Sequence, residues 1–188
     1  MESILHFADL DGLTMLAKLS SHYDNTVKKR ACIALAKTLK IDKTQVMAKE
    51  TGVIAVLATQ LSSPESVVSS SCAFAIAALA HNDANLAELL KMGTLEILIR
   101  HLQAEDKDPK RESMSAFASF SENGIHKYLT NLAKFRVKVR NSLEYVQLIV
   151  KILGSDDAAT VVHACDCIIA LSEDGQSDKI NIISGFQS

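Results

Sequence analysis

Residues 61–102 read LSSPESVVSSSCAFAIAALAHNDANLAELLKMGTLEILIRHL. This segment contains a long stretch of small and apolar residues, a polar turn, a short amphipathic stretch, a glycine and a second apolar stretch. The apolar side chains recur at helical spacing. A glycine ends one helix and turns the chain into the next at little cost, because it adopts a left-handed conformation easily. The segment therefore predicts three consecutive helices, with a corner at Gly93.

The same order of segments recurs along the chain. Gly12 lies in DGLTMLAKLSS, Gly52 in TGVIAVLATQLSS and Gly93 in MGTLEILIRHLQ, at intervals of 40 and 41 residues. A fixed period of this length is typical of solenoids, in which stacked helical units bury one continuous core. We expect one domain over residues 1–188, with units at 3–40, 41–80, 81–122 and 123–172 and the start of a fifth at 178–188.

In that fifth unit, Gly185 occupies the position of the earlier glycines. A solenoid normally ends in a unit with a polar outer face. We therefore expect the chain to be part of a longer protein, with further repeats or a capping partner beyond residue 188.

The long helices of the units align with one another. Cys32 and Leu39 lie 40 residues before Cys72 and Leu79. A polar residue should cap each long helix at its start. Ser62 and Glu65 form a candidate capping box with Pro64 in the first turn, and the other candidate caps are Asp24 or Asn25, Asp108, and Ser155 or Asp156.

The fourth unit departs from the period. From Gly93 to the equivalent Ser142 there are 49 residues, and the excess falls mainly in 128–141. Within it, basic residues at 134, 136, 138 and 140 alternate with Phe135, Val137 and Val139. Alternation of this kind indicates a short extended segment. It would pack on the solenoid or on a partner, and the sequence does not decide between the two.

Composition excludes several classes of function. The net charge of −2 and the pI of about 6.3 give no bulk attraction to nucleic acid or to anionic membranes. No apolar run approaches the ~20 residues that span a bilayer. The four cysteines are too few for a disulfide framework. We expect a protein of the cytoplasm that binds neither nucleic acid nor a membrane interior.

Candidate chemistry is sparse. His163 and Cys167 are four residues apart on a helix and could share a metal ion, with Cys165 pointing elsewhere. The alternative is that all three are small or medium residues of the core, as Cys32 and Cys72 are at equivalent places. There is no nucleophile motif and no glycine-rich phosphate loop. We therefore expect neither catalysis nor a cofactor.

The segments LAHNDANLAELLKMGTLEILIRHL and ALSEDGQSDKINIISG resemble the armadillo repeat. The resemblance covers nearly the whole chain. It implies an all-α, right-handed α-solenoid of about four armadillo-type three-helix repeats. It also implies a scaffold that binds a partner peptide or helix along the concave surface formed by the long helices.

Two groups within this class are similar to the chain. In armadillo proteins of cilia and flagella, a His and an Asn or Ser precede the first helix, as His81 and Asn82 do here. This likeness implies a ciliary or cytoskeletal role. The segment LSEDGQSDKI resembles nuclear-import adaptors of the importin-alpha type, which bind basic peptides through a ladder of Trp and Asn. The matching positions hold other residues, namely Ala34 and Thr38, Phe74 and Ala78, Ser115 and Ser119, and Asp166 and Ala170.

Helix position suggests which residues would contact a partner. Basic clusters open two of the long helices, and three serines follow the start of another. The candidates are Lys28, Lys29, Arg30, Ser70, Ser71, Lys110 and Arg111. The cations would suit an acidic partner, and the alternative is a solvated face. The serines would be phosphorylated if exposed, whereas as buried small residues they would let helices approach closely.

Overall fold

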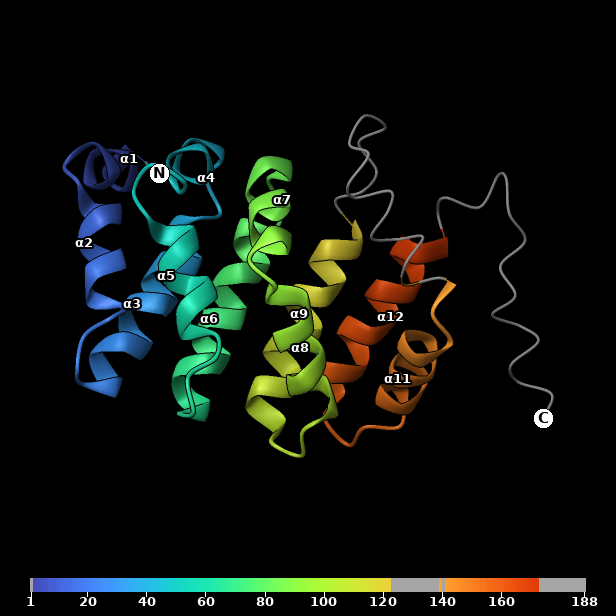
Figure 1. Cartoon of the computed structure of the whole chain (residues 1–188). Coiled ribbons are helices and arrows are strands. Elements are labelled where there is room, and N and C mark those ends of the chain that lie inside the picture. The colour runs from blue at the N-terminus through green and yellow to red at the C-terminus, as the bar shows by residue number, and fades with distance from the viewer. Residues whose placement is uncertain (1, 123–138, 140, 173–188) are drawn as a thin grey trace, which may run out of the picture.

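The computed structural model describes residues 2–122, 139 and 141–172. The regular elements in these ranges are α-helices arranged in a row (Figure 1). The first three are α1 (Glu2–Asp9), α2 (Gly12–Leu19) and α3 (Asn25–Thr38). The next six are α4 (Asp42–Met47), α5 (Val53–Gln60), α6 (Ser66–Leu79), α7 (Asp83–Lys91), α8 (Thr94–Gln103) and α9 (Lys107–Glu122). The last two are α11 (Leu143–Leu153) and α12 (Ala158–Ser172).

The helices form two layers. The long helices α3, α6, α9 and α12 pack side by side in chain order, and these are the most extensive contacts between elements. Helices α2, α5, α8 and α11 each pack on the long helix that follows them, and α1, α4 and α7 line one edge of the row (Figure 1). This arrangement is the all-α solenoid that the sequence predicts. The expected fifth unit at 178–188 lies outside the described residues.

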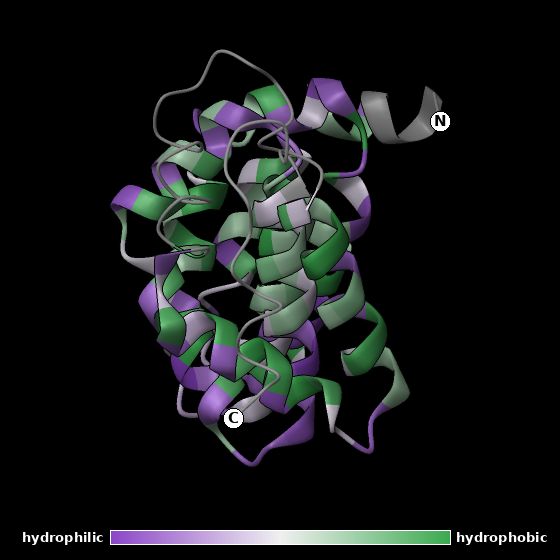
Figure 2. Cartoon of the chain, turned by 90° about the vertical axis from the view of Figure 1, so that its right-hand side faces the viewer, coloured by the Kyte–Doolittle hydropathy of each residue, from purple (hydrophilic) through white to green (hydrophobic). Residues whose placement is uncertain are grey.

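Helix α6 is the centre of the row. Every residue from Val68 to Leu79 is buried except Phe74, which is half-buried. A helix that is apolar or small on all sides must be covered on all sides, and α3, α5 and α9 cover this one. Helix α12 lies at the C-terminal end of the row, which faces the viewer in Figure 2, and its Val162 and Ile169 are more than half exposed.

Two cysteines show how closely the long helices approach. The Sγ atoms of Cys32 in α3 and Cys72 in α6 lie 3.3 Å apart, and both side chains are fully buried. The predicted alignment of the long helices at a period of 40 residues is therefore present as a direct contact. The hydrogen bond with Cys32 raises the pKa of the Cys72 thiol, and burial raises it further.

The glycine corners are confirmed at two of the three places. Gly52 and Gly93 have φ of +74° and +73° and precede α5 and α8. At the first corner the prediction was wrong, because the left-handed residue is Asp11, with φ of +59°, and Gly12 is already the first residue of α2. Gly12 has a different role, since a Cβ there would collide with the ring of Phe7.

The caps agree with the sequence in one case only. Asp24 caps α3, because its carboxylate accepts from the backbone N–H groups of Thr26 at 2.7 Å and Val27 at 3.0 Å. The predicted capping box of Ser62 and Glu65 is wrong, since α6 starts at Ser66 and Glu65 makes no side-chain cap. Pro64 accordingly precedes the helix.

The other two caps are displaced by one or two residues from the candidates. Asp106, and not Asp108, accepts from the backbone at the start of α9, through the N–H of Asp108 at 3.2 Å. Asp157, and not Ser155 or Asp156, accepts from the N–H of Thr160 at 3.0 Å at the start of α12. Acidic residues cluster at both turns, and composition alone did not identify the one that directly precedes the helix.

Buried amides join neighbouring units on the edge formed by α4 and α7. Gln45 Nε2 donates to the carbonyl oxygens of Leu39 at 2.8 Å and Ala78 at 3.3 Å. Asn85 Nδ2 donates to the carbonyl oxygen of Gln45 at 2.9 Å, from a position 40 residues later. A buried amide must be hydrogen-bonded to be tolerated, so these bonds hold the units in register.

In the ranges that the structure describes, none of the helices combines the length and the apolar content needed to cross a membrane.

We predict that Gly52→Ala lowers the free energy of unfolding by about 1–2 kcal/mol, because a side chain strains the left-handed backbone. No atom lies within 4 Å of a Cβ built at Gly52, so the loss isolates the backbone effect. Gly154→Ala is the control, since Gly154 has φ of −86° and its Cβ would make an ordinary contact. Urea denaturation of both variants measures the difference. Equal losses in the two would contradict the assignment.

Candidate functional site

The row of long helices carries two adjacent pockets that meet at Phe74. The first has a volume of about 310 Å³ and the second about 450 Å³. The first is lined by Lys29, Ile33, Val67, Ser70, Ser71, Phe74, Asp108, Arg111 and Glu112. The second is lined by Ala36, Lys40, Asp42, Gln45, Phe74, Ala77, Ala78, His81, Ser115 and Ser119. We call the two together the long-helix groove.

Four of the seven residues expected to contact a partner line the first pocket. They are Lys29 from α3, Ser70 and Ser71 from α6, and Arg111 from α9. The period of the long helices brings them together, because each lies near the start of its own helix and the helices stand side by side. Their role in binding stays a prediction.

The serines are buried small residues that form part of the floor of the first pocket. Ser70 and Ser71 are 8% and 6% exposed. Their hydroxyls donate to the carbonyl oxygen of Val67 at 3.3 Å and 2.7 Å. This placement favours the interpretation that they permit close helix approach over the one in which they are open to modification.

The three cations of α3 keep their charges available. Lys28 and Lys29 are half-buried and Arg30 is exposed. Among the residues that the structure describes, none of the three forms an ion pair. Only Lys29 lines the groove.

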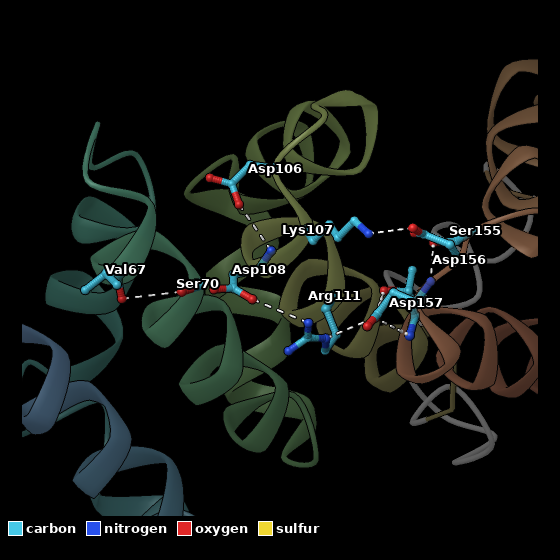
Figure 3. A network of polar contacts seen from close by, with 10 residues as sticks. Val67, Ser70, Asp106, Lys107, Asp108, Arg111, Ser155, Asp156 and Asp157 are labelled. Carbon is cyan, nitrogen blue, oxygen red and sulfur yellow. Dashed lines mark hydrogen bonds and ion pairs between the residues drawn. The ribbon is translucent and has the colours of Figure 1, made fainter.

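Arg111 is held by neighbouring carboxylates. Its Nε donates to Asp157 Oδ2 at 3.0 Å across to α12, and its Nη2 lies 3.4 Å from Asp108 Oδ1 on its own helix (Figure 3). Hydrogen bonds from the Thr160 hydroxyl and from Arg111 lower the pKa of Asp157 to about 2. Arg111 therefore joins α9 to α12, and little of its positive charge is left for a partner.

Lys110 lies on a different surface. It lines a separate pocket of about 370 Å³, formed by residues of α8, α9, α11 and α12 and of the turns between them. Lys107, Lys151 and Asp156 also line this pocket. Lys107 Nζ pairs there with Asp156 Oδ2 (Figure 3). Lys110 lies off the long-helix groove although Arg111 lines it, because consecutive helical residues point about 100° apart. Its role in binding stays a prediction.

Glu112 is the groove residue that sequence reasoning missed. It is half-buried in the first pocket, one residue after Arg111. Burial raises the pKa of its carboxyl, and the nearby charges of Arg111 and His163 only partly offset this effect. Within the described part of the chain, Glu112 has no ion-pair partner. Its signal in the sequence was its spacing of four from Asp108, which places both carboxylates on one helix face.

Phe74 also lines the groove but was not among the residues expected to contact a partner. The sequence named it only as a position that matches the Trp and Asn ladder. The pairs that match the Trp and Asn ladder of import adaptors include Phe74 with Ala78 and Ser115 with Ser119. All four line the second pocket. The ladder positions of α6 and α9 therefore face the groove, with one aromatic ring and three small residues in them.

The His163, Cys165 and Cys167 cluster is spread over α12. Cys167 is buried and its Sγ lies 3.4 Å from Ser121 Oγ, whereas Cys165 is exposed. His163 Nδ1 faces Asp166 Oδ2 at 3.6 Å. In the described ranges, no group of three or more His, Cys, Asp or Glu side chains is placed to hold a metal ion. Of the alternating segment at 134–140, Val139 is described and is buried in the core.

The profile of the Cnd1 family, non-SMC mitotic condensation complex subunit 1, matches residues 14–170. The chain belongs to the Cnd1 family. A search of curated proteins gives no match.

Engineered proteins are among the solved structures similar to this member of the Cnd1 family. One is 23% identical with a TM-score of 0.74, over 86% of this chain and 62% of its own length. A designed armadillo repeat protein in complex with the peptide (KR)4 is 19% identical with a TM-score of 0.76, over 90% and 68%. Another designed armadillo repeat protein is 18% identical with a TM-score of 0.79, over 99% and 74%. The fold is therefore a right-handed solenoid of the armadillo type, and the chain spans less than two thirds of the first of these structures.

We predict that Asp157→Ala lowers the free energy of unfolding at pH 7 by about 1–2 kcal/mol, because it removes a helix cap and the partner of Arg111. The folded pKa of about 2 lies below the ordinary 3.8. The contribution is therefore complete above about pH 4–5 and is lost as the pH falls through 4 towards 2.

Denaturation of both proteins at pH 7 and pH 3 should show the gap between them closing at the lower pH. Asp156→Ala is the matched control, since Asp156 is exposed and pairs with the exposed Lys107, and its effect should be smaller. A gap that stays constant from pH 7 to pH 3 would contradict the role of Asp157.

Proposed function

We propose that the chain is a protein-binding scaffold, and that the long-helix groove takes an extended peptide or a helix of a partner. The observation that carries this proposal is the groove itself. Two pockets join at the half-buried ring of Phe74, on a surface where the described residues leave Lys29 and Glu112 without ion pairs. Polar groups that converge around an apolar centre are typical of recognition surfaces.

The designed relative supports the peptide as the kind of ligand. It has the same fold and was solved with the basic peptide (KR)4. In this chain Lys29 lines the groove, and Lys28 and Arg30 are its neighbours in α3. We therefore propose that part of the partner is acidic and contacts these three cations. No step in this binding needs a cofactor or catalysis.

Membership of the Cnd1 family supports an assembly as the setting. The family is described as a subunit of the mitotic condensation complex, and we propose that this chain likewise binds neighbouring subunits of a multiprotein complex. A ciliary or cytoskeletal scaffold in the cytoplasm is the earlier expectation, for which the match of His81 and Asn82 is the support. The import adaptor is the weaker alternative, because Phe74 is the only aromatic residue at the ladder positions of the described repeats.

Selection from a library of random twelve-residue peptides tests the groove. We predict that selected peptides bind the Phe74→Ala variant about tenfold more weakly or worse, because a central aromatic contact carries much of the binding energy. Met92→Ala is the control, since Met92 is an exposed apolar residue outside the groove. Thermal melting of both variants shows that they fold. Peptides whose affinity falls with Met92 and not with Phe74 would overturn the groove as the site.

Reversing the α3 charges tests the acidic contact. We predict that replacing Lys28, Lys29 and Arg30 with Glu weakens the binding of selected peptides that contain Asp or Glu by about tenfold. Reversal of Lys43, Lys49 and Lys91, which are exposed elsewhere, gives the same change in net charge and should have little effect. Fluorescence anisotropy at 0.05 M and 0.5 M salt measures both, since such contacts weaken with salt. If both triple variants lose the same affinity, the effect is one of net charge, and the acidic contact at α3 is contradicted.

A further inference from the structure

The charges around the first pocket are ordered by helix. Helix α3 contributes Lys29, which forms no ion pair with any described residue, and its neighbours Lys28 and Arg30 are also cations. Helix α6 contributes no charge, only Val67, two serines and the ring of Phe74. Helix α9 contributes Asp108, Arg111 and Glu112.

The α9 side of the pocket has a net negative charge. Arg111 is shared between Asp157 and Asp108, at 3.0 Å and 3.4 Å, so two carboxylates and one guanidinium form one cluster. Glu112 adds a further carboxylate that has no ion-pair partner among the described residues.

Glu112 is costly without a ligand. Half-burial removes part of the water around its carboxylate, and charged groups are unfavourable in such places unless they are paired. The same burial raises the pKa of its carboxyl, because it disfavours the charged form. A lysine or arginine side chain of a ligand that enters the pocket would supply that cation.

We propose that the groove takes a partner segment with an acidic side chain at Lys29, an apolar side chain over Phe74 and a basic side chain at Glu112. This inference rests on the proposed function and adds the charge order of the ligand. A ligand of a single charge, such as a purely basic peptide, would meet repulsion from one wall. The order of charges therefore selects among peptides of equal length and equal apolar content.

Three sets of synthetic peptides test this order. They share one apolar centre and one length, and their two ends are acidic and basic, both basic, or both acidic. We expect the mixed set to bind at least about fivefold more tightly than either uniform set, measured by fluorescence anisotropy at moderate salt.

Swapping the charges of the groove gives the decisive variant. Lys29→Glu with Glu112→Lys keeps the net charge, and it should prefer mixed peptides in which acidic and basic residues have been exchanged. The matched control is Lys49→Glu with Glu96→Lys, at two exposed positions outside the groove. This control should keep the original preference.

The outcomes separate the two proposals. If peptides from the random library bind through Phe74 but the three sets bind equally, or the groove swap leaves the preference unchanged, the charge order is wrong and the scaffold function stands. If neither the library nor any of the three sets yields a peptide whose binding depends on Phe74, both are overturned. If the protein binds one uniform set of peptides most tightly, the charge order is wrong, and the sign of that set shows whether the α3 or the α9 side of the pocket dominates binding.

Discussion

Close packing of the long helices is the constraint on which the rest of the structure depends. Cys32 and Cys72 bring α3 and α6 to a contact of 3.3 Å, and nearly every side chain of α6 from Val68 to Leu79 is buried. Interiors pack at crystal-like density, so larger residues at these positions would push the helices apart. The prevalence of Ala, Ser and Cys in α6 follows from this spacing. So does the groove, since only helices held side by side align residues from three units around one pocket.

Polar contacts set the register that packing alone leaves loose. Small apolar surfaces slide past one another with little penalty, whereas a buried amide must reach a specific partner. Gln45 and Asn85 do this on one edge, and Arg111 with Asp157 does it between α9 and α12. The second contact lies beside the groove. It neutralises Arg111, and in doing so it leaves Glu112 as the charged group of α9 that faces a ligand.

Much of the fold could be predicted because it depends on periodicity. A spacing of 40 residues between Gly12 and Gly52 and between Cys32 and Cys72 reports stacking directly. The caps could not be placed to the residue, since Asp106, Asp108, Asp156 and Asp157 are the same residue type and differ in where each helix begins. Only part of the site could be predicted from the sequence. Lys29 could be predicted from its position in the helix. Glu112 could not, because its role depends on which face of α9 lines the groove and on which carboxylates pair with Arg111.

The first corner has a consequence for any comparison of these repeats by sequence. Gly12, Gly52 and Gly93 fall in one column of an internal alignment, yet Gly52 and Gly93 are there for their backbone angle and Gly12 is there for the space beneath the Phe7 ring. A consensus unit derived from this chain would average two unrelated requirements at that column. Grafting that consensus into the first unit would place the left-handed angle one residue too late, and the opening helix would join the solenoid with the wrong phase.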